Sequence, residues 1–187
     1  VNNDKFILNI SDYTIFGLPH NISQLKSLYE NSTTLHKMNF NVNVGTVVWN
    51  QCKDILTNNT SHTRLIYSSD IENNELTMKK YKNIEKLNFI NKDGINKPTI
   101  VINRGYGVGA YKFQYCLIKG GFDYLIENHL ICINHMNSIT NDELISLYES
   151  IINSLENEKT KLFIKLYFGN NAINTTELNY ILPIYNE

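Results

Sequence analysis

Arginine and alanine are scarce in this chain of 187 residues: each occurs only twice, against 29 Asn, 24 Ile and 15 Lys. This skew is typical of a genome rich in A and T, so most of the asparagine carries no functional signal. With 17 basic and 18 acidic residues, the formal net charge is −1. Such a balance excludes a basic, tail-driven nucleic-acid binder. It leaves open a DNA-reading module whose basic residues are gathered on one face.

Long apolar runs and paired cysteines are missing as well. No stretch of about 18 apolar residues occurs, so no membrane span is expected. The three cysteines stand singly, without a Cys-x-x-Cys pair, and they favour neither a zinc site nor a disulfide framework. The sequence opens at Val1 without an initiator Met or a signal-peptide pattern. We therefore expect a segment of a longer intracellular, cytoplasmic protein.

The motifs of common enzyme sites are also absent. The sequence has no nucleophile elbow, no P-loop, no paired histidines on a helix and no metal-ligand cluster. Gly105–Gly109 is glycine-rich and follows a predicted strand, but its spacing is not that of a dinucleotide-binding turn. We expect no catalytic residue, metal or cofactor in this segment. A small nucleotide-binding or enzymatic domain that uses the Gly105–Gly109 loop remains an alternative.

The chain does contain enough apolar surface for a folded core, with 42% hydrophobic and 11% aromatic residues. Helical spacing of apolar residues predicts a helix over 21–30 with Asn21 as its N-cap, and a short helix from 49 to 56. Residues 70–97 are polar and predict an exposed excursion with one hairpin. Apolar alternation and β-branched residues predict strands at 5–10, 40–48 with a bend at Gly45, 64–67, 98–102, 111–118 and 129–134.

The C-terminal part has a different pattern. Thr140-Asn-Asp-Glu143 is a capping box, and an apolar helical face follows it over 144–155. Residues 161–168 predict a further helix, with a strand as the alternative, and a last turn from Thr175 ends at Pro183. We predict an α+β fold: a mixed, mostly antiparallel β-sheet core with helices packed on it, and a helical C-terminal part. We predict one domain, 1–187, that is strand-rich over 1–139 and helical over 140–187.

The first candidate site is Asn103-Arg104-Gly105-Tyr106-Gly107, at the end of the predicted strand 98–102. A guanidinium on a closely approaching glycine loop suits guanine edges or phosphates. Tyr111 and Lys112 add a stacking group and a cation nearby. The alternative is a tight hairpin in which Arg104 pairs with a neighbouring acid.

Two further polar segments are candidates. Asn50, Gln51 and Lys53 follow Trp49 at a strand-to-helix corner and suit adenine or phosphate contacts. The alternative is that Trp49 is a core anchor and Asn50 caps the helix. Asn128 and His129 lie at the start of the strand predicted over 129–134. Two roles are possible for them there: a DNA contact, or a structural role in which the histidine is hydrogen-bonded within the protein.

Four segments that occur in this order resemble a known family, as does the closing run 174–184. The segments are Gly45-Thr-Val-Val-Trp-Asn-Gln-Cys-Lys-Asp-Ile-Leu56, Arg64-Leu-Ile-Tyr-Ser-Ser-Asp-Ile71, Pro98-Thr-Ile-Val-Ile-Asn-Arg-Gly-Tyr-Gly107 and Glu127-Asn-His-Leu-Ile-Cys-Ile133. Together they resemble the target-recognition (specificity) domain found downstream of the catalytic domain in adenine-specific DNA methyltransferases of bacterial restriction–modification systems. The resemblance covers about residues 40–184.

The resemblance implies a function. Such a domain grips duplex DNA, reads its target in the major groove, and holds it against a catalytic domain that flips and methylates an adenine. The family's Asn/Asp-Pro-Pro-Tyr/Phe motif and cofactor-binding glycine motif are missing here. S-adenosylmethionine and catalysis, with or without DNA cleavage, would thus belong to the parent protein.

The implied partners are double-stranded DNA and a covalently linked or associated methyltransferase catalytic domain. Base readers in the loops 72–97 and 107–112 are an alternative to the three segments above. A protein-interaction module without a DNA role is the other alternative. The candidate DNA contacts through positive charge are Lys53, Lys79, Lys80, Lys82, Arg104 and Lys112.

Overall fold

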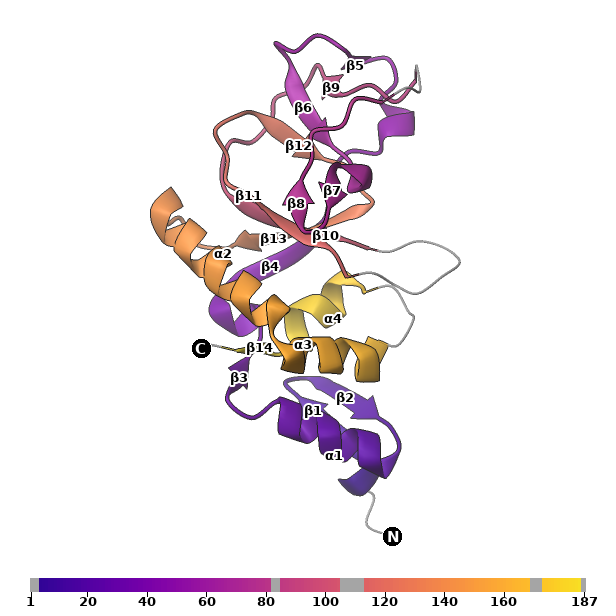
Figure 1. Cartoon of the computed structure of the whole chain (residues 1–187), viewed down its shortest axis with the longest axis vertical. Coiled ribbons are helices and arrows are strands. Elements are labelled where there is room, and N and C mark those ends of the chain that lie inside the picture. The colour runs from indigo at the N-terminus through magenta and orange to yellow at the C-terminus, as the bar shows by residue number, and fades with distance from the viewer. Residues whose placement is uncertain (1–3, 82–84, 105–112, 169–172, 186–187) are drawn as a thin grey trace.

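The computed structural model describes residues 4–81, 85–104, 113–168 and 173–185 (Figure 1). Its elements confirm the predicted α+β class, because mostly antiparallel sheets carry helices that gather toward the C-terminus. Within the described ranges, no helix is long and apolar enough to cross a membrane.

A central sheet of four strands occupies the middle of the molecule (Figure 1). Its order is β11-β10-β13-β4, with every neighbouring pair antiparallel. The sheet is covered on both faces: Ile100 and Ile102 of β10 join the largest apolar cluster, and Val101 joins a second cluster on the other face. This explains the continuous apolar run of β10. The strand bounds are β4 (Phe40–Val44), β10 (Thr99–Asn103), β11 (Tyr115–Ile118) and β13 (Leu130–His135).

A second sheet lies above the central one, with a short hairpin beside it (Figure 1). Its order is β12-β6-β9-β5, and only the β12–β6 pair is parallel. Asn73 and Asn74 form the hairpin turn and both have positive φ, which asparagine tolerates. The bounds are β5 (Leu56–Thr57), β6 (Thr63–Ile66), β9 (Phe89–Ile90) and β12 (Tyr124–Ile126), and β7 (Ile71–Glu72) with β8 (Glu75–Leu76) in the hairpin.

Helices and two small β pairs form the opposite end of the molecule (Figure 1). Helix α2 packs its apolar face into the largest cluster, and its Tyr148 hydroxyl donates to Ile133 O of the central sheet at 2.7 Å. The bounds are α1 (Pro19–Leu28), α2 (Asn141–Glu156), α3 (Glu158–Phe163) continued by the π-helical η5 (Ile164–Phe168), α4 (Thr175–Tyr180), the hairpin β1 (Ile7–Ile10) with β2 (Tyr13–Phe16), and the pair β3 (Ser32–Thr33) with β14 (Ile184–Tyr185).

Four short 3₁₀ turns connect these elements. They are η1 (Asp4–Phe6), η2 (His36–Met38), η3 (Trp49–Gln51) and η4 (Ser68–Asp70). The capping box at α2 forms as predicted, with Thr140 Oγ1 accepting from Glu143 N and Glu143 Oε2 accepting from Thr140 N.

Three local predictions are wrong. The stretch 70–97 is not an exposed excursion throughout, because Asp70, Asn88 and Ile90 are buried and β9 pairs within the second sheet. The helix expected over 49–56 is only the turn η3, because Leu56 and Thr57 instead pair with β9. The N-cap of α1 is Leu18, followed by Pro19 at the first helical position, and Asn21 lies inside the helix. Proline there has its φ already set for the helix and no N–H to satisfy.

Candidate nucleic-acid interface

Two of the three predicted polar segments, Asn103–Arg104 and Asn128–His129, meet at one edge of the central sheet, and Val47, which lies shortly before the third, bonds to the same turn. Because β13 runs antiparallel to both β10 and β4, its start lies beside their ends, with Asn103 opposite Leu130 and Val44 opposite Ile131. The turn Glu127–His129 leads into β13, and η3 follows β4 after a short bend. We use the name polar edge for Asn103, Arg104, Asn128 and His129, together with Asn50 and Gln51 of η3, which begins two residues after Val47.

Gly45 allows the chain after β4 to approach this turn. A Cβ atom at Gly45 would lie 2.2 Å from Glu127 O and 2.5 Å from Ile126 O, closer than a side chain can come. Beyond the bend, Asn128 N donates to Val47 O at 2.9 Å, and Val47 N donates to Ile126 O at 3.1 Å. The bend predicted at Gly45 is thus present, and it holds Val47, two residues before η3, against the turn that carries Asn128 and His129.

Arg104 leaves β10 next to that turn and is only half-buried. Its backbone N donates to His129 O and its Nη1 to Asn128 O, both at a long 3.5 Å. No carboxylate of the described residues lies within ion-pair distance of its guanidinium. Neighbouring Asn103 donates from Nδ2 to Ser68 O at 3.2 Å, which ties the polar edge to η4.

Asn50 and Gln51 are exposed on η3, and their side chains have no partner in the described part of the chain. The cap of η3 is Val48 without a side-chain bond, so the capping role considered for Asn50 is wrong. Trp49 is half-buried against the apolar cluster of the second sheet, as an anchor would be. Lys53 pairs with Glu85 at 2.6 Å, with both side chains about half exposed, so this pair contributes little to stability.

His129 is held by Glu127. Its Nδ1 contacts the Glu127 carboxylate, its backbone N donates to Glu127 Oε2 at 3.1 Å, and its ring stays 43% exposed. Glu127 itself is only 1% exposed, and burial raises the pKa of its carboxyl against the opposing effects of His129 and Lys86. The hydrogen-bonded structural role considered for His129 is present, and the outer part of its ring still faces solvent.

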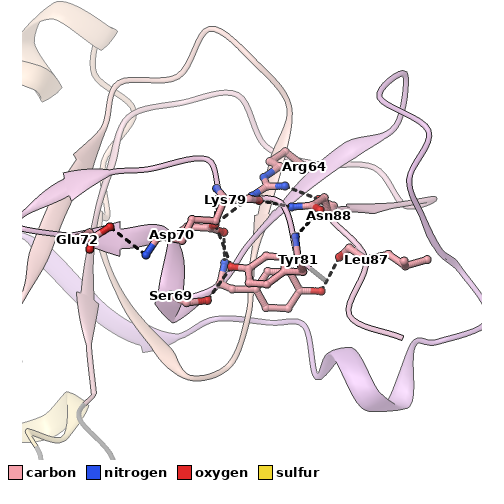
Figure 2. Close-up of polar contacts among 9 residues, drawn as sticks. Arg64, Ser69, Asp70, Glu72, Lys79, Tyr81, Leu87 and Asn88 are labelled. Carbon is pink, nitrogen blue, oxygen red and sulfur yellow. Dashed lines mark hydrogen bonds and ion pairs between the residues drawn. The ribbon is translucent and has the colours of Figure 1, made fainter. Parts of the chain in front are cut away.

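A buried polar cluster behind η4 was not predicted (Figure 2). Arg64 Nη2 pairs with Asp70 Oδ1 at 3.1 Å, with side chains 8% and 0% exposed. Asp70 also accepts from Lys79 N at 3.1 Å and from the Tyr81 hydroxyl at 3.0 Å. Tyr67 N donates to Asp70 Oδ2 at 2.9 Å, so both oxygens of this buried carboxylate have donors, which a buried charge requires.

The same cluster supports the chain on either side of it. Arg64 Nη1 donates to Asn88 O at 3.3 Å, and the Tyr67 hydroxyl donates to Leu87 O at 2.7 Å (Figure 2). The Lys86 ammonium lies 4.3 Å from the Tyr67 ring centre and 4.5 Å from that of Tyr81, an arrangement that favours a cation. Arginine is scarce in this chain, and this made Arg64 as informative as Arg104. That was the signal for the buried cluster that sequence reasoning missed.

The remaining predicted contacts divide into two groups. Lys79 pairs with Glu72 at 3.0 Å, and Lys80 is exposed without a side-chain partner among the described residues. The loop 107–112 and the residues Gly105, Tyr106, Gly107, Tyr111, Lys112 and Lys82 lie outside the described residues.

In comparisons with known proteins, no protein-family model and no curated protein matches the chain. Within the described ranges, no group of three or more His, Cys, Asp or Glu side chains is placed to hold a metal ion. The polar edge presents amide, guanidinium and imidazole groups, which can donate hydrogen bonds and contact anions.

Proposed function

We propose that this chain is a sequence-specific duplex-DNA recognition module, the target-recognition part of an adenine-specific DNA methyltransferase in a bacterial restriction–modification system. The module binds and orients the duplex. A catalytic domain outside this segment, linked or associated, flips the adenine and transfers the methyl group from S-adenosylmethionine. The protein then works in the cytoplasm, where its DNA lies.

The convergence at the polar edge carries the proposal. Asn50, Gln51 and Asn128 supply amides, which match the adenine edge, and Arg104 supplies the fork that matches guanine or phosphate. Arg104 directly follows β10 and His129 directly precedes β13, and the pairing of these strands brings the two residues together, whereas Asn50 and Gln51 lie on η3. A net charge of −1 means that affinity comes from local contacts and not from a long-range field.

The test is binding of labelled pooled duplexes by the chain, followed by selection of the bound sequences. We expect a preferred short target and a binding constant that falls with salt, with a log–log slope of about −0.9 for each phosphate contacted. Arg104→Ala is expected to weaken binding of the selected target about tenfold or more.

Arg104→Lys separates base reading from charge. Because lysine keeps the cation and loses the planar fork, this variant is expected to keep the salt slope and lose sequence preference. The matched control is Lys119→Ala, which removes an exposed cation paired with Glu149 at the far end of β11. Unchanged affinity and unchanged preference in Arg104→Ala would refute the proposal for this edge.

A further inference from the structure

A cavity of about 580 Å³ opens beside the Arg64–Asp70 cluster, between the β6–β9 pair and the segment 78–81. Apolar and aromatic side chains dominate its walls, and Arg64, Lys79 and Lys80 add positive charge; none of its described lining residues is acidic. The apolar and aromatic members are Met78, Tyr81, Phe89 and Phe122, and Asn58, Thr60 and Asn88 complete the lining.

The wall of the cavity is already organised. Arg64 Nη2 donates to Lys79 O at 3.2 Å, Asn88 Nδ2 donates to the same oxygen at 2.5 Å, and Asp70 holds both Arg64 and Tyr81 (Figure 2). Side chains fixed in this way lose little further freedom when a ligand enters. Pre-formed clefts with apolar walls and a few placed polar groups are typical of ligand sites.

One donor in this wall has no partner. Arg64 Nε is buried and makes no hydrogen bond within the described part of the chain, although its guanidinium carbon lies 5.7 Å from the centre of the Phe89 ring. Because Nε has almost no accessible surface, it does not itself contact a ligand, and the cations that a ligand can reach in this wall are those of Lys79 and Lys80.

We propose that this cavity takes one unstacked nucleotide of the bound DNA, with the base against Met78, Phe89 and Phe122 and the phosphate at Lys79 and Lys80. Aromatic walls combined with cations are the means by which proteins hold single-stranded nucleotides. Lys80 is exposed, and Lys79 gives up only an exposed pair with Glu72, which costs little. The inference rests on the proposed function and adds a second contact to it.

The turn η4 connects the cavity to the polar edge. The Tyr81 hydroxyl, in the cavity wall, bonds Ser69 Oγ at 2.7 Å, and the neighbouring Ser68 carbonyl accepts from Asn103. The same turn thus contacts both the cavity wall and the polar edge. A base in a mismatch enters more easily than a paired base, because less unpairing energy is required.

The experiment measures fluorescence anisotropy with three probes: a short oligodeoxythymidylate, a fully paired duplex, and the same duplex with one central mismatch. We expect the mismatched duplex to bind about tenfold more tightly than the paired one. Met78→Ala and Phe122→Leu should reduce that advantage and weaken oligodeoxythymidylate binding. Lys80→Ala should lower the salt slope by about one.

Two variants serve as matched controls. Met136→Ala removes a methionine that is 53% exposed, against 45% for Met78, and Lys165→Ala removes an exposed lysine of η5; neither residue lines the cavity. If the protein binds oligodeoxythymidylate and Met78→Ala weakens that binding, the cavity is supported. If the protein also fails to bind paired duplex, only the proposed function is refuted. Equal binding of mismatched and paired duplex, with Met78→Ala behaving as Met136→Ala, would overturn the inference.

Discussion

At the scale of single residues, the two arginines have opposite environments. Arg64 is buried and paired with Asp70, whereas Arg104 is half-buried with long contacts to backbone oxygens. A buried guanidinium needs its counter-ion, because the cost of removing the charge from water is otherwise not compensated. Asp70 thus offsets the buried charge of Arg64.

Asp70→Asn tests this dependence. The amide has nearly the same shape but no charge, so Arg64 keeps its burial and loses its counter-ion. We expect a loss of about 3–5 kcal/mol in the free energy of unfolding by urea. The control is Glu149→Gln, which breaks the exposed pair with Lys119 and should cost at most about 1 kcal/mol. Equal losses in the two variants would contradict the assignment.

At the scale of elements, Gly45 sets how close the end of β4 comes to the turn 127–129. Alanine would place Cβ against the backbone oxygens of Glu127 and Ile126, which cannot rotate away as a side chain does. We expect Gly45→Ala to lower stability by about 1–3 kcal/mol and to weaken duplex binding, because the turn that carries His129 must shift.

Gly17→Ala is the matched control for that variant. A Cβ there would meet Ile22 Cδ1 at 3.3 Å, the end of a flexible side chain, and Gly17 lies far from the polar edge at the hairpin β1–β2. A thermal melt and the anisotropy assay on both variants separate the effects. Unchanged DNA binding in a folded Gly45→Ala protein would show that the turn does not contribute.

Local sequence signals predicted the elements whose causes are local. The capping box at Thr140 and the buried strand after Pro98 both formed, since each depends on neighbouring residues. The short strands β5 and β9 were missed because pairing between distant residues overrides the helical spacing of Cys52, Ile55 and Leu56. The Arg64 cluster was missed for the same reason: its partners Lys79 and Asn88 follow Arg64 by 15 and 24 residues.

The polar edge shows what topology adds to a correct local prediction. Arg104 and His129 were each recognised as candidates, but only the antiparallel pairing of β13 with β10 places them together. Sequence separation gave no indication that Asn128 N would bond Val47 O. Side-chain chemistry was therefore visible in the sequence, and its spatial arrangement was not.

At the scale of the whole molecule, ionisable side chains lie inside the apolar clusters. Cys116 and Cys132 join the cluster between the two sheets, and Tyr148 lies in the largest cluster. Burial raises the pKa of both thiols from 9.0 to about 12, and that of the Tyr148 hydroxyl from 10.0 to about 12. These groups stay neutral in the folded protein at pH values at which the unfolded chain ionises them.

The consequence is a loss of stability in alkali. Each of these acids has its pKa raised by folding, so the unfolded state releases protons first, and stability falls as pH rises from 9.0 toward about 12. We expect urea midpoints to be steady from about pH 7 to about pH 8 and to decrease above that range. The double variant Cys116→Ala, Cys132→Ala should have a lower urea midpoint at neutral pH, because each substitution leaves a small cavity. Its midpoint should then decrease less steeply between about pH 9 and about pH 10, below the range where tyrosine ionisation dominates. An identical slope in the wild-type and double-variant proteins would mean that the thiols do not ionise on unfolding in this range.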